Sequence, residues 1–233
     1  MTGYGQFCPI AKAMELLDQR WTMLVMREVV LGSSRFNEIR RGVPRISPAL
    51  LSTRLRQLQR AGLVERQVGH GPIAYLPTPA GRELGEVLEA LGRWGTRWIG
   101  DLGDDDLDPH LLLWDMRRRV DLAGLPGRRV VVAFTFIDLS GPGASWWAVL
   151  DRDDPSRPVD VCDDDPGFDV DLRVTTTLRA LTQVWRGDRE WSGAARSGDL
   201  VVTGPRALAR ALPGWFRLST FAAVPRPETA SDR

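Results

Sequence analysis

A basic, hydroxyl-bearing helix face is the feature of this sequence best suited to binding a charged partner. Ser47 is a typical N-cap, Pro48 suits the first helical position and Gly62 is typical of a helix end, so we expect a helix over about residues 47–61. At about 100° per residue, its leucines share one stripe and the other side is small, polar and basic. The candidate contact residues are Ser47, Pro48, Ala49, Ser52, Thr53, Arg56 and Arg60.

This residue pattern is typical of a helix that reads DNA. Small residues allow close approach to base edges, and Ser, Thr and Arg side chains bond to bases or phosphates. The alternative is an ordinary amphipathic helix with a solvated basic face. Arg54 lies nearer the leucine stripe, where we expect it to pair with an acidic neighbour.

The preceding elements favour a DNA-binding helix. Helical spacing predicts helices from Cys8-Pro9 to about Asp18, then over about residues 21–31 and 35–41. We expect the apolar residues of the first helix, Ile10 and Met14 among them, to pack against the second. The short third helix, the turn at residues 42–44 and the basic helix then form a helix-turn-helix.

The following elements predict a wing and a dimerisation helix. Two strands at residues 63–68 and 73–77 flank a Gly/Pro tip, and wings of this kind contact the DNA backbone or minor groove. Arg66, Gln67 and His70 are therefore candidate contacts, with no metal role for His70. A helix over about residues 78–98 then carries an apolar stripe, which either pairs with the same helix of a second copy, as we favour, or packs on a second domain. The stripe comprises Leu84, Val87, Leu88, Leu91, Trp94 and Trp98.

Several short motifs recur in one known family. They are Cys8-Pro9-Ile10, Arg20-Trp21-Thr22, Leu31-Gly32, Arg35-Phe36-Asn37-Glu38-Ile39, Ile46-Ser47, Arg54-Leu55-Arg56-Gln57-Leu58, Gly62-Leu63-Val64, Tyr75-Leu76, and Thr78 with Gly81. Over about residues 8–99 the chain resembles the HxlR-type winged-helix transcriptional regulators. The resemblance implies a homodimeric bacterial protein that binds double-stranded DNA, with the first and last helices of this domain forming the dimer and repression the commoner mode. Cys8 stands where some relatives carry an oxidant-sensing cysteine; the alternative is a small apolar residue at a helix start.

Charge and composition divide the chain of 233 residues. Residues 1–100 contain 14 Lys and Arg against 8 Asp and Glu, whereas residues 101–233 contain 17 against 22, so only the first half suits a polyanion. Two cysteines make no disulfide framework, and neither a signal segment nor a membrane-spanning run is present. We therefore expect a cytoplasmic protein with a DNA-binding and dimerisation domain at residues 1–100, an acidic linker at 101–109, a second domain at 110–225 and a tail at 226–233.

The second domain has an α+β pattern around an antiparallel sheet. The expected elements are a helix at 110–122, strands at 128–137, 146–151, 159–162 and 168–174, a helix at 175–185, a strand at 198–204 and a helix at 205–212. Over about residues 110–222 this half resembles the sterol-carrier-protein-like fold, carried by Asp169–Thr175, Leu181–Gly187, Ala194, Gly198-Asp199-Leu200, Val202-Thr203-Gly204, Trp215-Phe216 and Phe221.

The resemblance implies an apolar tunnel for a small apolar ligand. Aromatic walls suit such a pocket, although the same residues could simply fill the core. The candidate lining residues are Trp114, Phe134, Phe136, Trp147, Trp185 and Trp215.

The sequence as a whole favours a ligand-responsive transcriptional regulator, most commonly a repressor, that binds an inverted-repeat operator as a homodimer. The alternatives are a carrier of an apolar ligand and a thiol-based redox regulator acting through Cys8. Catalysis is not expected, because the chain lacks a nucleophile elbow, a phosphate loop, a zinc signature and a paired carboxylate set. We expect no cofactor or metal.

Overall fold

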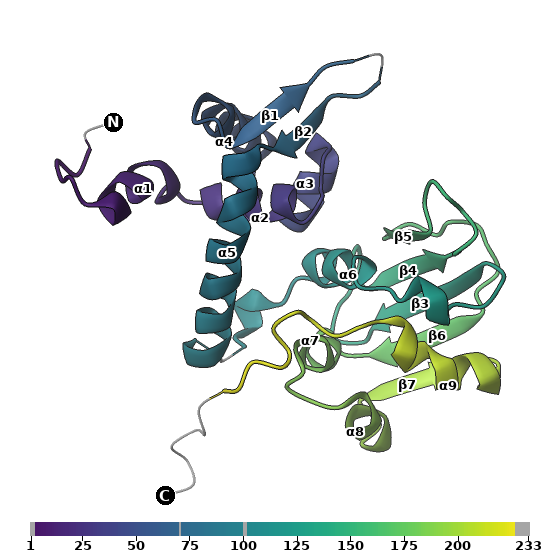
Figure 1. Cartoon of the computed structure of the whole chain (residues 1–233). Coiled ribbons are helices and arrows are strands. Elements are labelled where there is room, and N and C mark those ends of the chain that lie inside the picture. The colour runs from purple at the N-terminus through teal and green to yellow at the C-terminus, as the bar shows by residue number, and fades with distance from the viewer. Residues whose placement is uncertain (1–2, 70, 100–101, 227–233) are drawn as a thin grey trace, which may run out of the picture. The chain divides into compact units, whose positions relative to one another are not determined.

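The chain folds into two compact units, which we describe separately. The computed structural model describes residues 3–69, 71–99 and 102–226 (Figure 1). Unit 1 spans Met1–Gly95 and unit 2 spans Thr96–Arg233. Within these described ranges, no helix has the length and apolar character needed to span a membrane.

Unit 1 is a set of short helices followed by a hairpin and a long helix. In chain order these are α1 (Pro9–Leu17), α2 (Thr22–Val30), α3 (Phe36–Gly42), α4 (Pro48–Arg60), the antiparallel strands β1 (Val64–Gln67) and β2 (Ala74–Pro77), and α5 (Pro79–Trp98). The last residues of α5 extend beyond the boundary of the unit. The order confirms the predicted helix-turn-helix and the hairpin that follows it.

Helix α4 forms for the reasons that its sequence predicts. The Ser47 hydroxyl accepts the Leu50 N–H at 3.3 Å, which caps the helix. Leu51, Leu55 and Leu58 are each no more than 1% exposed and fill the unit 1 core. The predicted helix and its buried stripe are confirmed.

A buried carboxylate joins α2 to the end of α3. The Glu28 side chain is fully buried, and its oxygens accept hydrogen bonds from Arg27 at 2.9 Å and from the Ser33 hydroxyl at 3.3 Å. Arg27 also donates to the Gly42 carbonyl at 2.6 Å. This network fixes the place where α3 ends and the turn into α4 begins.

The apolar faces of α1 and α5 are only partly covered. Ile10 is 74% exposed and Met14 is 40% exposed, so the expectation that they pack on α2 is wrong. Leu17, the third apolar residue at this spacing, does contact the core, together with Leu16. Helical spacing identifies an apolar face but does not say what covers it. On α5, the exposed stripe comprises Val87 at 46%, Leu91 at 53%, Trp94 at 56% and Trp98 at 61%.

The start of α5 is packed closely against the chain that enters the wing. Thr78 donates its hydroxyl to the Gly62 carbonyl at 2.6 Å and accepts the Gly81 N–H at 3.1 Å. A Cβ atom on Gly81 would overlap the Leu63 carbonyl oxygen. Glycine is therefore needed here, and this contact sets where α5 leaves the hairpin.

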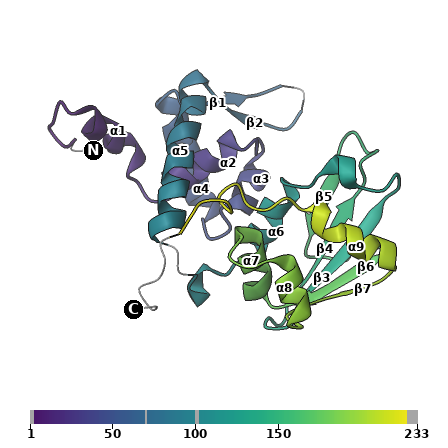
Figure 2. The same ribbon diagram turned by 60° about the horizontal axis from the view of Figure 1, so that its bottom comes forward.

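In its described part, unit 2 combines a five-stranded sheet with four helices and two short 3-10 turns. After η1 (Asp104–Asp106) come α6 (Pro109–Arg117), η2 (Leu122–Gly124), β3 (Val130–Phe136), β4 (Ser145–Leu150), β5 (Val159–Cys162), β6 (Leu172–Thr176), α7 (Leu178–Arg186), α8 (Trp191–Arg196), β7 (Leu200–Thr203) and α9 (Arg206–Trp215). Figure 2 shows the strands side by side, in the order β5-β4-β3-β6-β7. The α+β class is confirmed for the whole chain.

The sheet is mixed rather than antiparallel. Strand β3 pairs antiparallel with β4, but it pairs parallel with β6, with Val132 opposite Leu172. The expected antiparallel sheet is therefore wrong in this pair. Alternation of apolar and polar residues indicates a strand but carries no information about its direction.

Tertiary contacts also move several expected boundaries. The helix expected at 110–122 ends at Arg117, because Val120 instead bridges to Phe216 and the Asp121 N–H bonds to the Trp215 carbonyl at 2.8 Å. The strand expected at 168–174 starts at Leu172.

At its other end, this strand continues into the residues expected to start a helix. Thr175 and Thr176 belong to β6, and Thr177 caps α7 by accepting the Ala180 N–H at 3.0 Å. The short helix α8 was not expected from the sequence, since six residues are too few for a helical period to stand out.

Candidate nucleic-acid interface

The predicted contact residues lie together on the side of α4 that faces away from the core. Its amino-terminal end presents small side chains and its carboxyl-terminal part presents arginine. Ser47, Pro48, Ala49, Arg56 and Arg60 are exposed, and Ser52 and Thr53 are partly exposed. This face therefore offers hydroxyl groups and two cations to a partner.

Hydrogen bonds along the helix hold one of these arginines in place. Thr53 donates its hydroxyl to the Ala49 carbonyl at 3.0 Å. The same Thr53 hydroxyl oxygen accepts a hydrogen bond from Arg56 Nη2 at 3.2 Å. The Arg56 side chain thus lies along the outer face, with further guanidinium donors left to meet a base edge or a phosphate.

Arg54 has a different role from the one expected. Its Nε donates to the Arg20 carbonyl at 3.0 Å, and its Nη1 donates to the side-chain oxygens of Gln19 and Gln57. The expectation of an acidic partner is wrong, because the turn between α1 and α2 brings neutral oxygens to this place. Arg54 joins α4 to that turn.

The wing offers one clear cation in its described part. Arg66 on β1 is exposed and lies opposite Tyr75 on β2. Gln67 is also exposed, but its amide donates to the Glu65 carboxylate at 3.0 Å. The predicted contact His70 lies outside the described residues.

Ion pairing distinguishes the arginines of this face from those of unit 2. Within the ranges that the structure describes, Arg56, Arg60 and Arg66 take part in no ion pair. In unit 2, by contrast, most arginines are paired with aspartates: Arg118, Arg128, Arg129, Arg152, Arg157, Arg179, Arg186, Arg189, Arg217 and Arg226. The positive charge of the α4 and wing surface is therefore not neutralised by the protein.

Sequence reasoning missed further cations beside this face. Arg40 and Arg41 on α3, and Arg45 in the turn before α4, are all exposed. In helix-turn-helix proteins the first helix of the pair crosses the DNA backbone. Their place in that helix and turn is the signal that could have identified them.

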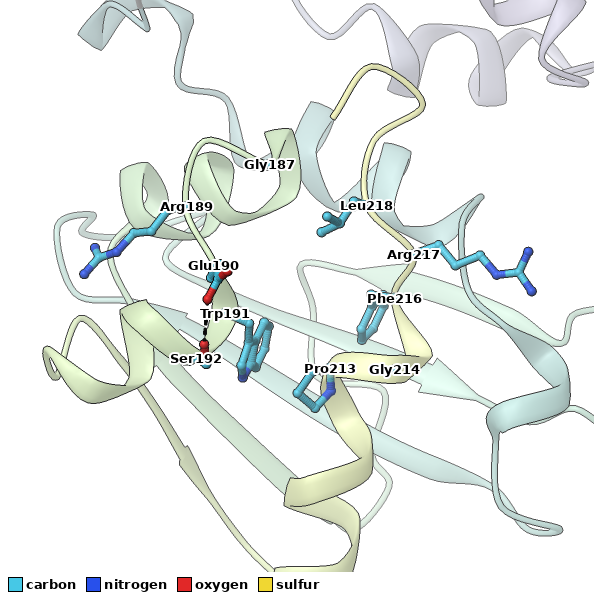
Figure 3. A pocket seen from close by; sticks show the side chains of 10 residues that line it. All are labelled: Gly187, Arg189, Glu190, Trp191, Ser192, Pro213, Gly214, Phe216, Arg217 and Leu218. Carbon is cyan, nitrogen blue, oxygen red and sulfur yellow. Dashed lines mark hydrogen bonds between the residues drawn. The ribbon is translucent and has the colours of Figure 1, made fainter. Parts of the chain in front are cut away.

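In unit 2, the predicted pocket residues are mostly core residues. Trp114, Phe134, Phe136, Trp185 and Trp215 are at most 9% exposed, and Trp147 is partly exposed on β4. None of the six lines the pocket shown in Figure 3, which has a volume of about 650 Å³. Its lining residues are Gly187, Arg189, Glu190, Trp191, Ser192, Pro213, Gly214, Phe216, Arg217 and Leu218.

Cys8, the predicted redox residue, occupies the N-cap position of α1. Its thiol is free and partly buried, and its side chain forms no capping hydrogen bond. The thiol of Cys162, on β5, donates to the Trp147 carbonyl at 3.8 Å.

A helix-turn-helix with a β-hairpin wing defines the class of this chain as a transcriptional regulator. Residues 16–102 match the HxlR-like helix-turn-helix family, and the chain belongs to the HxlR family. The HTH-type regulator YvaP of Bacillus subtilis is 37% identical over 41% of this chain and 92% of its own length. A second such regulator, from Synechocystis, is 36% identical over 41% of this chain and 73% of its own length.

A solved structure gives a similar comparison. The reduced form of the transcriptional regulator YodB from B. subtilis is 32% identical and covers 41% of this chain and 100% of its own, with a TM-score of 0.37.

Proposed function

We propose that this chain binds inverted-repeat, double-stranded DNA as a homodimer, and that unit 2 adjusts this binding when it takes up a small apolar molecule. The observation that carries the DNA-binding proposal is that Arg56 and Arg60 on α4 and Arg66 on β1 are exposed and form no ion pair with any residue that the structure describes. Cations that are not neutralised within the protein can displace counterions from phosphates, which dominates DNA affinity. Repression is the expected mode.

The uncovered apolar faces of α1 and α5 support the homodimer. Exposed side chains such as Ile10, Leu91 and Trp94 would be costly to leave in water on a single chain, and burying them against the same helices of a second copy removes that cost. A twofold dimer also matches the symmetry of an inverted repeat.

The role of unit 2 rests on its pocket and on its excess of acidic residues. An acidic unit is poorly suited to contact DNA itself. A ligand bound to unit 2 therefore acts indirectly, by favouring one conformation of the dimer over another. The sterol-carrier-like identity of this unit stays a prediction, as does the assignment of residues 101–109 as a linker.

Selection from a random double-stranded DNA library tests the proposal without knowledge of the operator. We expect the full-length protein to enrich an inverted repeat with half-sites about 10 base pairs apart, and its affinity to fall steeply as salt rises. Failure to enrich any sequence, or an affinity that does not depend on salt, would contradict it. Sedimentation of the same sample measures whether the protein is a dimer.

A further inference from the structure

The unit 2 pocket is an open groove with one aromatic wall. It forms where the start of α8 faces the end of α9 and the segment that follows (Figure 3). The ring of Trp191 stands on one side of it, and Pro213 and Leu218 complete the apolar lining. Phe216 lies beneath, 7% exposed, with its ring packed edge to face against Phe134 of the core. Its volume of about 650 Å³ lies within the range of small-molecule sites, about 300–1,000 Å³.

The segment that carries one wall is held in place by backbone contacts. The Ser219 N–H donates to the Trp185 carbonyl at 3.0 Å, and the Arg217 N–H donates to the Arg119 carbonyl at 2.9 Å. Ala222 approaches Gly187 so closely that a Cβ atom added to Gly187 would lie 2.8 Å from the Cβ atom of Ala222. The groove is therefore formed before any ligand arrives, which lowers the entropic cost of binding.

The arginines near the groove are engaged elsewhere. Arg189 pairs with Asp199 at 2.6 Å, and Arg217 pairs with Asp121 at 3.2 Å. Figure 3 shows both arginine side chains pointing away from the groove. An anionic ligand would find no cation directed at it and would lie beside the Glu190 carboxylate, so the groove suits an uncharged molecule.

One hydrogen-bond donor remains in the wall. The Ser192 hydroxyl is bonded to the Glu190 carboxylate at 3.1 Å. In the part of the chain that the structure describes, no protein group accepts a hydrogen bond from the indole N–H of Trp191, whose ring packs partly against the core. A donor of this kind is best satisfied by an oxygen or nitrogen acceptor on the ligand.

We propose that this groove binds an uncharged, flat aromatic molecule that carries a hydrogen-bond acceptor. The ligand stacks on the ring of Trp191 and accepts a hydrogen bond from its N–H. That the ligand regulates DNA binding rests on the proposed function of unit 2, whereas ligand binding to the groove does not. Binding itself is measured without DNA, so a failure here and a failure to bind DNA are separate results.

The first test fills the groove. A Cβ on Gly214 would meet nothing within 4 Å, so Gly214→Leu places a side chain in the groove without a clash at its base. The probe is prodan, a neutral naphthalene with a ketone acceptor whose emission shifts when it leaves water. We expect saturable binding to the full-length protein, and a dissociation constant raised at least about tenfold in Gly214→Leu. The control, Ala211→Leu, adds the same side chain at an exposed position of α9. It should change the dissociation constant for prodan by less than about twofold.

The second test removes the donor and keeps the wall. In Trp191→Phe the affinity for prodan should fall by about three- to tenfold, since a net hydrogen bond contributes about 0.5–1.5 kcal/mol. A prodan analogue without the ketone should lose less affinity in this variant. An equal loss for both probes would overturn the assigned hydrogen bond. Unchanged prodan binding in Gly214→Leu would overturn the site itself, because the probe would then lie elsewhere, for example on the apolar faces of α1 and α5.

Discussion

The backbone of Gly42, at the end of α3, lies directly against the buried carboxylate of Glu28 on α2, with no space for a side chain between them. The Arg27 guanidinium bonds both to this carboxylate and to the Gly42 carbonyl. The buried Glu28 carboxylate and its partner Arg27 thus set the distance between α2 and the end of α3.

Gly42→Ala should therefore destabilise unit 1. The added methyl group would overlap the Glu28 carboxylate, and overpacking of this kind costs about 1–3 kcal/mol. Urea denaturation of the two proteins measures the difference. Gly71→Ala in the wing, where a Cβ meets nothing within 4 Å, is the control and should leave the free energy of unfolding almost unchanged. Equal stability of the two variants would mean that the Glu28 network adapts easily.

Arg56→Ala should weaken DNA binding and reduce its sequence preference. Loss of an arginine that reads a guanine costs about 1–3 kcal/mol, whereas loss of a phosphate contact weakens binding to all sequences alike. Anisotropy titrations with the selected operator and with a scrambled duplex separate these outcomes. Arg206→Ala, an exposed site on α9, serves as the control. Unchanged affinity in Arg56→Ala would remove α4 from the interface.

Leu91→Glu should dissociate the proposed homodimer. Leu91 is 53% exposed on α5, and a second copy that covered it would have to bury an unpaired carboxylate in the variant. We expect the dimer dissociation constant to rise by at least about a hundredfold, measured by analytical ultracentrifugation over a range of concentrations. The control is Ala207→Glu, which adds the same charge to another exposed helix position, on α9. A dimer that persists in Leu91→Glu would assign the interface to other residues.

Asp171 should give unit 2 a stability that depends on pH. Burial raises the pKa of this carboxyl, but hydrogen bonds from Arg128 at 2.8 Å and from the Val131 N–H at 2.9 Å, together with the charge of Arg128, lower it overall. A lowered pKa in the folded state stabilises the fold above the unfolded value of about 4, and this contribution is lost as the pH falls through the folded value.

Asp171→Asn tests this linkage. We expect it to reduce the free energy of unfolding by about 1 kcal/mol near neutral pH, and the difference from wild type to shrink below about pH 4. Asp164→Asn, in an exposed turn, should show neither effect. A difference that stays constant with pH would indicate a packing effect rather than the titration of Asp171.

The elements of the DNA-binding half could be predicted because their signals are local. The Ser47 cap, the leucine stripe of α4 and the Gly/Pro tip of the wing each act over a few residues. The partners of Arg54 could not be predicted in the same way, because one of them is a backbone oxygen 34 positions earlier in the chain.

The second half shows what local patterns omit. Thr175 and Thr176 suit a strand or the start of a helix, and only their pairing with β3 and β7 decides between the two. Trp191 lines the groove, whereas Phe216 and most of the aromatic residues that the sequence singled out for a pocket fill the core. Residue type predicted an aromatic unit correctly, but which rings face solvent is a tertiary property.

The parallel pairing of β3 with β6 also orders events during synthesis. Strand β4 follows β3 at once and covers one of its edges, but the contact of Val131 with Asp171 must wait for 40 further residues. Until then an apolar strand has an open edge, which is a template for wrong pairing. Because domains fold as units from the amino terminus, we expect the nascent chain to carry a finished helix-turn-helix while one edge of β3 is still unpaired.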